Sequence, residues 1–322
     1  MPVLKEIESQ VETLGKVYEF ALGDHLNDIV NLIRSAEFLL FVGCGSSYYV
    51  GLGASKYHTG IASKTSKAVP GGEILQALRW NVPGVPGKKV AVLISRSGET
   101  TEVVKSVSIL KDEGFTTVGL TIEDGSSLTK EVDIPIVLPM EERSIVMTAS
   151  FTGMMLTLQI IVERSSGKVE KNIYEKILSS VKEIFESFKK EAKEFSKFSH
   201  YVFLGSGPYE GIARESALKL QEMSLTYTEA YTTLDYRHGP KSLVDENTAI
   251  VIFGDGEEER KLAEELEGIG GSVSLRKVLA KDYRDTFAQV MFSQLLGYEI
   301  ASRKGVDVEA PRHLTKVVKL DG

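Results

Sequence analysis

Short apolar runs of strand length alternate along the chain with longer segments whose apolar residues recur at helical spacing. The runs that predict buried strands in the first half are residues 37–42, 88–94, 116–122 and 134–138. The segments that predict helices between them are residues 47–57, 71–78 and 100–114. Near-continuous apolar strands that alternate with helices are typical of a parallel sheet covered on both faces. The pattern therefore predicts an α/β fold with a doubly wound, mostly parallel sheet.

The pattern starts again in the second half as a repeat. A strand, a Gly-x-Gly turn and a helix occur in LLFVGCGSSYYVGLGASKY from residue 39 and in YVFLGSGPYEGIARESALK from residue 201, an offset of 162 residues. VAVLISRSGETTE (90–102) corresponds to AIVIFGDGEEER (249–260), where the Ser and Thr residues are lost. Two copies of one α/β unit explain the 322 residues. We expect a first domain at 1–165 with N-terminal helices, and a second domain with the C-terminal tail at 166–322.

Two further segments bear on this organisation. Residues 166–198 are rich in charge, with apolar residues at three- and four-residue spacing, and predict one long surface helix that links the halves. Residues 145–162 are apolar but interrupted by Thr, Ser, Gly and Gln, which favours a buried helix over a membrane span. The N-terminus has no apolar export signal. We therefore expect no membrane association.

Charge and cysteine content narrow the function classes. The net charge is −7, so no overall basic field favours nucleic acid or anionic lipid as a partner. The single cysteine, Cys44, excludes an intramolecular disulfide and a multi-thiolate zinc site. We expect a cytoplasmic protein that uses no metal and no redox cofactor.

Two loops that join an apolar strand to a helix carry hydroxyl groups. They are Gly43-Cys44-Gly45-Ser46-Ser47 and Ser95-Arg96-Ser97-Gly98-Glu99-Thr100. Helix N-termini favour anions, and ligands of doubly wound sheets bind at this edge. Neither loop has the spacing of a dinucleotide fingerprint or a P-loop. Each loop alone is also compatible with simple helix capping, but two of them in one half, together with Arg96, favour a phosphate site.

A third polar constellation lies on a predicted helix at 211–224. Glu215, Lys219 and Glu222 fall at i, i+4 and i+7, so they share one face of that helix. The spacing alone suits a solvated ion pair as well as a catalytic group.

Five motifs in order along nearly the whole chain resemble the isomerase part of glucosamine-6-phosphate synthase. They are Gly-Cys-Gly-Ser-Ser, Ser-Arg-Ser-Gly-Glu-Thr, Glu215-Ser-Ala-Leu-Lys-Leu-Gln-Glu222, the segment from Glu229-Ala-Tyr to Arg237-His238-Gly-Pro, and the tail from Asp307 to Lys316. This resemblance implies two sugar isomerase (SIS) domains in tandem. With Pro2 and no N-terminal cysteine, we expect no glutaminase activity. Stand-alone double-SIS chains of this size are similar to glucosamine-6-phosphate deaminases and, more distantly, to fructosamine-6-phosphate deglycases.

The resemblance also implies roles for individual residues. The sugar phosphate would contact Ser95, Arg96, Ser97 and Thr100, with Ser46 and Ser47 beside the sugar; the synthase commonly has Gln where this chain has Arg96. Glu222 would move a proton between C1 and C2, beside the cation Lys219. His238, contributed by the partner of a homodimer, would open the sugar ring, and Lys316 would contact the carbonyl.

These roles match what the reaction needs. A histidine exchanges protons near neutrality, a carboxylate can carry a proton between adjacent carbons, and a cation stabilises a developing oxyanion. We therefore expect a glucosamine-6-phosphate deaminase that converts glucosamine 6-phosphate to fructose 6-phosphate and ammonia. A deglycase and a non-catalytic sugar-phosphate sensor are the alternatives, although the chain has no basic segment for a DNA-binding helix-turn-helix.

Overall fold

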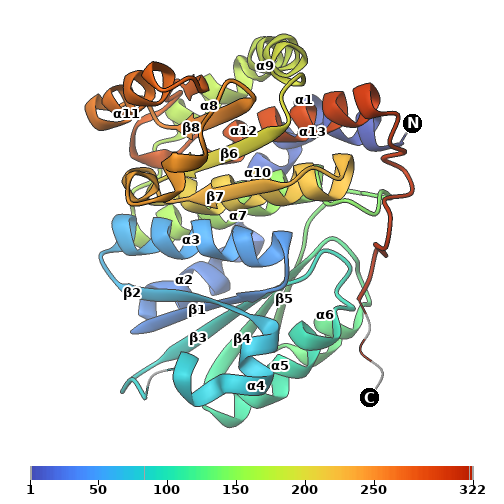
Figure 1. Ribbon diagram of the computed structural model, residues 1–322. Coiled ribbons are helices and arrows are strands. Elements are labelled where there is room, and N and C mark those ends of the chain that lie inside the picture. The colour runs from blue at the N-terminus through green and yellow to red at the C-terminus, as the bar shows by residue number, and fades with distance from the viewer. Residues whose placement is uncertain (1, 83, 319, 321–322) are drawn as a thin grey trace. The chain divides into compact units, whose positions relative to one another are not determined.

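Two parallel sheets, one in each of two compact units, organise the chain. The computed structural model describes residues 2–82, 84–318 and 320 (Figure 1). The N-terminal unit comprises Glu12–Arg143, Ala149–Lys171 and Thr315–Gly322, and the C-terminal unit comprises Met1–Val11, Ser144–Thr148 and Asn172–Leu314. Both units are therefore discontinuous along the chain, and the C-terminal tail belongs with the first sheet.

The N-terminal unit contains a five-stranded parallel sheet in the order β2-β1-β3-β4-β5. Its strands are β1 (Phe38–Gly43), β2 (Thr65–Pro70), β3 (Lys89–Ile94), β4 (Phe115–Thr121) and β5 (Ile134–Val137). Its helices are α2 (Asn27–Ser35), α3 (Ser46–Ala62), α4 (Gly71–Asn81), α5 (Thr101–Asp112), α6 (Ser127–Glu131) and α7 (Ala149–Ser166), with the short η1 (Asp24–Leu26). Helix α1 (Pro2–Leu22) contains the division between the units.

Both faces of this sheet are covered, which explains its continuous apolar strands. Alternate strand residues such as Leu40 and Leu93 form a buried core with α4, α5 and α6. On the opposite face, Gly51 of α3 packs close to Phe41 and Ile94. Helices α2 and α7 lie on that same side (Figure 1).

The C-terminal unit repeats this arrangement with four parallel strands in the order β7-β6-β8-β9. Its strands are β6 (His200–Gly205), β7 (Thr228–Tyr231), β8 (Thr248–Phe253) and β9 (Ser272–Arg276). Its helices are α8 (Lys171–Ser179), α9 (Val181–Phe195), α10 (Tyr209–Ser224), α11 (Glu257–Gly268), α12 (Thr286–Gln289) and α13 (Met291–Lys304), with η2 (Leu234–Arg237), η3 (Pro240–Leu243) and η4 (Lys281–Tyr283).

The internal repeat is visible in both the strand positions and the sheet order. Strand β6 begins at His200, 162 residues after the start of β1 at Phe38. In each sheet the first strand of the copy is flanked by the next two strands in sequence, β2 and β3 or β7 and β8. The predicted α/β fold with two mostly parallel, helix-covered sheets is therefore confirmed.

The prediction of a single long helix over residues 166–198 is wrong. Helix α7 extends to Ser166, and two separate helices, α8 and α9, follow. The break lies at Ser180, whose N–H is shared between the carbonyls of Lys176 and Ile177 at 3.3 and 3.1 Å. A serine pair at 179–180 competes for backbone hydrogen bonds and weakly favours helix ends.

Helix α7 confirms the buried helix predicted over residues 145–162. Almost all of its side chains are buried, including polar ones such as Thr157 and Gln159. Among the described residues, no helix is long and apolar enough to cross a membrane.

Candidate functional site

The loop after β3 brings the predicted phosphate-binding residues to the carboxyl edge of the first sheet. Ser95, Arg96 and Ser97 follow the end of β3, and Thr100 directly precedes α5. The Oγ atoms of Ser95 and Thr100 lie 3.0 Å apart, and all of this loop is at least half-buried. The loop therefore presents hydroxyl groups beside the N-terminus of a twelve-residue helix.

Helix capping does not explain these hydroxyl groups. Thr100 stands at the N-cap of α5 but its side chain makes no capping hydrogen bond. The N-cap of α3 is Gly45, so neither Ser46 nor Ser47 fills that role. The N-cap residue of neither helix therefore makes a side-chain capping hydrogen bond.

Two glycines let the backbone turn tightly at this edge. A Cβ on Gly43 would lie 2.5 Å from the carbonyl carbon of Ser47, so the first loop requires glycine there. Gly98 has φ +64°, and a Cβ on it would lie 2.1 Å from the Oγ of Ser126. The first loop is therefore held close to α3, which follows it, and the second is held close to Ser126 at the N-cap of α6.

Arg96 is held by a buried carboxylate. Its Nη1 lies 3.1 Å from Oε2 of Glu142, and the side chains of Arg96 and Glu142 are only 7% and 0% exposed. The carboxylate of Glu142 also accepts hydrogen bonds from the backbone N–H and the hydroxyl of Ser150. Glu142 was not predicted from the sequence, where it stands among charged residues that suggest a solvated loop.

The C-terminal tail reaches the same loop. Nζ of Lys316 donates to the carbonyl of Glu142 at 2.9 Å and lies 3.7 Å from the Glu123 carboxylate. The guanidinium of Arg96 donates a long hydrogen bond, 3.4 Å, to the carbonyl of Lys316. The predicted residues Arg96 and Lys316 are thus brought together, with Glu142 between them.

Helix α10 of the C-terminal unit carries a buried ion cluster. Lys219 is fully buried, lies 3.4 Å from Oε1 of Glu215 and forms a short contact with Glu222. Burial lowers the pKa of Lys219, but the carboxylates of Glu215 and Glu222 outweigh that effect and keep the pKa above its ordinary value. The interpretation of these residues as a solvated ion pair is therefore wrong. Lys219 and Glu215 are fully buried, and of the three side chains only Glu222, 20% exposed, reaches the surface.

His238 stands on a different element from this cluster. It follows η2, its backbone N–H donates to Asp235, and its side chain is exposed. Glu265 of α11 anchors the segment through Arg237 at 2.8 Å and Lys241 at 2.5 Å. No hydrogen bond or ion pair joins His238 to Lys219 or Glu222 in the part of the chain that the structure describes.

The predicted residues therefore form two groups. Ser46, Ser47, Ser95, Arg96, Ser97, Thr100 and Lys316 belong to the N-terminal unit, and Lys219, Glu222 and His238 belong to the C-terminal unit.

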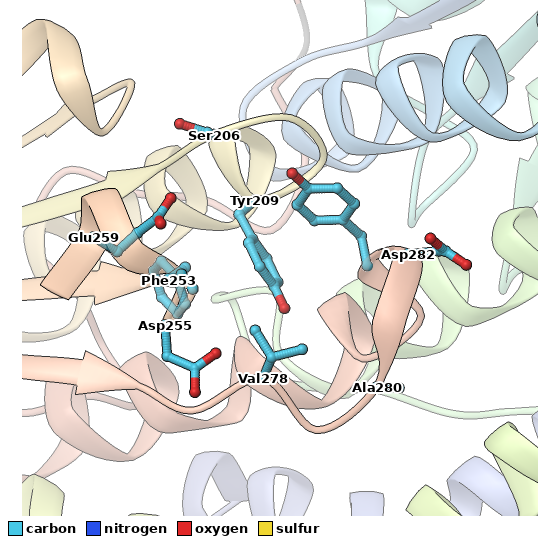
Figure 2. A pocket seen from close by; sticks show the side chains of 11 residues that line it. Ser206, Tyr209, Phe253, Asp255, Glu259, Val278, Ala280 and Asp282 are labelled. Carbon is cyan, nitrogen blue, oxygen red and sulfur yellow. The ribbon is translucent and has the colours of Figure 1, made fainter.

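The equivalent edge of the second sheet has a different chemistry. A cavity of about 220 Å³ lies there, and Figure 2 shows Asp255 and Glu259 beside it. Tyr209 and Tyr283 form part of its wall, with ring centroids 4.9 Å apart. Burial and the charge of Glu259 raise the pKa of the Tyr283 phenol. The second copy has thus replaced hydroxyl groups by carboxylates.

Comparisons with known proteins agree with the fold and with the motifs. The family model described as "SIS domain" matches residues 32–163 and 194–269. A crystal structure of glucosamine-6-phosphate deaminase from Thermotoga maritima is 36% identical, with a TM-score of 0.87, and covers 99% of this chain and 100% of that chain. The C-terminal domain of glucosamine-fructose-6-phosphate aminotransferase from Francisella tularensis is 27% identical, with a TM-score of 0.82, over 97% of this chain and 98% of that chain.

A curated relative gives the same picture. Glutamine–fructose-6-phosphate aminotransferase (isomerizing) of Vibrio parahaemolyticus is 28% identical over 96% of this chain and 55% of its own length. The chain spans about half the length of the curated relatives it matches. The first matched stretch contains all five strands of the first sheet and the second contains β6, β7 and β8 of the other sheet, and on this evidence the chain belongs to the SIS domain family.

Proposed function

We propose that this chain is a glucosamine-6-phosphate deaminase. Glucosamine 6-phosphate and water would give fructose 6-phosphate and ammonia. The observation that carries this proposal is the buried Glu215-Lys219-Glu222 cluster of α10, in which one carboxylate reaches the surface beside a buried cation. The similarity to the Thermotoga maritima deaminase, which extends over almost the whole of both chains, supports the same choice.

The reaction requires proton movement between two carbons. After the sugar ring opens, the C1 carbonyl makes the proton on C2 acidic. Glu222 takes that proton and returns it to C1, so that C1 is reduced and C2 becomes an imine carbon. Water then adds to C2 and ammonia leaves. No external oxidant or reductant is consumed.

Lys219 assists this step through its charge. Its pKa lies above the ordinary value, so it stays protonated at neutral pH beside Glu222. A fixed ammonium group lowers the energy of the oxyanion that develops as C2 loses its proton. Glu215 keeps the buried ammonium compensated while Glu222 changes its protonation state.

The phosphate would bind at the first sheet. Ser95, Ser97 and Thr100 would donate hydroxyl hydrogen bonds, the first turn of α5 would add its positive end, and Ser46 and Ser47 would flank the sugar. Because Arg96 is engaged by Glu142, we assign it to holding the loop and the tail beside Lys316 rather than to direct phosphate contact.

The proposal includes a homodimer in which His238 opens the ring of the partner's substrate. Support comes from exposed apolar side chains of the same unit: Leu225 and Tyr227 precede β7, Leu243 lies in η3, and Tyr227 is 93% exposed. Apolar surface of this kind near an edge strand is typical of a subunit interface.

Ammonia release from a panel of sugar phosphates tests the assignment. Glucosamine 6-phosphate should release ammonia and fructose 6-phosphate in equal amounts, and free glucosamine should be a poor substrate. Release of an amino acid from a fructosamine 6-phosphate, without turnover of glucosamine 6-phosphate, would identify a deglycase instead. Binding without turnover of either would identify a sensor.

A further inference from the structure

Three helices of the N-terminal unit end at the same place, and basic side chains cap them in a cycle. Arg34 of α2 donates to the carbonyls of Ser165 and Arg164 at the end of α7, at 3.0 and 3.2 Å. Lys168, which follows α7, donates to the carbonyl of Ile61 in α3 at 2.5 Å. Each of these helices is thus capped by a cation from a neighbour.

The third cation closes the cycle. Lys64, which follows α3, donates to the carbonyls of Arg34 and Ala36 at the end of α2, at 2.7 and 3.0 Å. Together the three cations and three helix ends enclose a cavity of about 130 Å³. Its polar lining consists of Arg34, His58, Lys64, Ser165, Ser166 and Lys168.

His58 is the polar group of this cavity that capping does not explain. Its side chain is only 2% exposed, and within the described residues neither ring nitrogen has a hydrogen-bond partner. The hydroxyls of Ser165 and Ser166, in contrast, both donate to the carbonyl of Val162. Buried polar atoms normally have a partner, so the imidazole is built to meet something that enters the cavity.

The state of His58 restricts that partner. Burial and the charge of Lys64 lower the pKa of His58 to about 4, so the ring is neutral at pH 7. A neutral imidazole offers one N–H donor and one bare nitrogen as acceptor. A fitting ligand therefore has both an acceptor and a donor.

The charge of the cavity favours an anion. Each helix C-terminus carries roughly half a negative elementary charge, so the three helix ends together contribute a charge of about −1.5. The three basic side chains each carry one positive charge. The cations of the lining therefore exceed the helix ends in charge. None of the described residues that line the cavity is a carboxylate, and the buried carboxylate of Glu163 lies behind it in the last turn of α7. Arg34 and Lys168 are exposed, which gives solutes access from the solvent.

We propose that this cavity binds a phosphate group that still carries a proton, either inorganic phosphate or the singly protonated terminal group of a phosphate monoester. Hydrogen phosphate has oxygens that accept hydrogen bonds from Arg34, Lys64 and the His58 N–H, and a hydroxyl that donates to the bare nitrogen. Its charge matches the excess positive charge of the cavity. The site lies at helix C-termini, whereas the proposed substrate phosphate lies at the N-terminus of α5, so the two sites are distinct and this inference does not depend on the proposed activity.

Histidine NMR on the intact protein tests the proposal. The ring signals of His58 are assigned with His58→Asn and followed during titration with inorganic phosphate at constant ionic strength. We expect a saturable shift and a raised His58 pKa. Lys64→Met should weaken the response at least about tenfold, and Ser97→Ala, which alters the proposed substrate loop, should leave it unchanged.

Parallel titrations identify the ligand chemistry. Sulfate, which has no donor at neutral pH, should bind more weakly than phosphate, and sodium chloride should give no saturable shift. Equal responses to methyl phosphate and inorganic phosphate would assign the site to phosphate monoesters, and a response to inorganic phosphate alone would assign it to the free ion. Absence of a saturable His58 shift up to about 50 mM phosphate, or its loss in Ser97→Ala, would overturn the site, and both results are readable on soluble protein whether or not Lys64→Met folds.

Discussion

The buried pair of Arg96 and Glu142 makes the most direct test of how the candidate site is held. Glu142→Gln keeps the shape of the side chain and removes its charge. Arg96 would then remain buried without a carboxylate, 3.1 Å from an amide. Because the side chains are 7% and 0% exposed, water cannot replace the lost charge without opening the loop.

The expected magnitude follows from that burial. Removing one partner of a buried ion pair costs about 3–5 kcal/mol. In a domain of 150–250 residues each kcal/mol lowers Tm by roughly 2–4 °C, so Glu142→Gln should lower the Tm of the N-terminal unit by about 6–20 °C. Arg96→Gln should cost less, since the Glu142 carboxylate keeps its two hydrogen bonds from Ser150.

A double-mutant cycle measures the coupling itself. The free energy of unfolding is measured by urea denaturation for both single variants and for Arg96→Gln/Glu142→Gln. The double variant should be more stable than the sum of the single losses predicts, by about 2–3 kcal/mol, because no uncompensated charge remains.

The adjacent pair of Arg143 and Glu141 provides a matched control. These side chains are 84% and 85% exposed and lie 3.5 Å apart, so their coupling should be close to zero. Additive losses at Arg96 and Glu142, within about 0.5 kcal/mol, would refute the argument that this pair fixes the loop.

Four further predictions concern the site and its surroundings. Glu222→Gln should reduce kcat by about 10²–10⁴-fold and stop exchange of solvent deuterium into the product, with little change in sugar-phosphate affinity, whereas near-normal turnover would leave Glu222 only an ion-pair role. Ser97→Ala or Thr100→Ala should raise KM for the phosphorylated sugar with little loss of stability, and equal turnover of free and phosphorylated glucosamine would contradict the loop assignment. Mixing Glu222→Ala with His238→Ala subunits should recover part of the activity, while no recovery after verified subunit exchange would assign each site to one chain. Burial and Glu102 raise the pKa of Cys44 to about 11, so iodoacetamide at pH 8 should alkylate the folded protein at least about 100-fold more slowly than the unfolded chain, as followed by mass spectrometry.

The central strands could be predicted from the sequence because they are buried on both faces. Strands β1, β3 and β4 lie within one residue of the apolar runs that predict them. Strands β2 and β7 could not be predicted from the sequence. Their residues, TSKAVP in β2 and TEAY in β7, are mostly half-buried and form no apolar run. Each lies at the edge of its sheet, where the neighbouring strand rather than the local sequence imposes an extended conformation.

The residues of the candidate site also differ in whether local or distant parts of the sequence determine their positions. Residues on one helix face, such as Lys219 and Glu222, could be predicted because the helical period alone brings them together. Glu142 could not, because its burial depends on Arg96, 46 residues away, and on Lys316, 174 residues away. In the sequence it has the same appearance as its neighbours Glu141 and Arg143, which are exposed.

The two copies of the repeat differ in charge at this edge of the fold, so we expect that the edge alone does not suffice to bind phosphate. The N-terminus of α11 offers the same backbone donors as that of α5, but three carboxylates, Glu257, Glu258 and Glu259, already stand in its first turn. A carboxylate about 6 Å from a phosphate charge costs roughly 3 kcal/mol at an effective dielectric constant of 20, while a helix terminus returns only about 0.3–1 kcal/mol. The repulsion from the carboxylates therefore exceeds the attraction of the helix terminus. We expect the cavity beside Asp255 and Glu259 to exclude phosphate. Asp255→Asn/Glu259→Gln should consequently leave KM for the sugar phosphate unchanged. A several-fold rise in KM would mean that the second edge takes part in substrate binding and that the repulsion between its carboxylates and phosphate is smaller than argued.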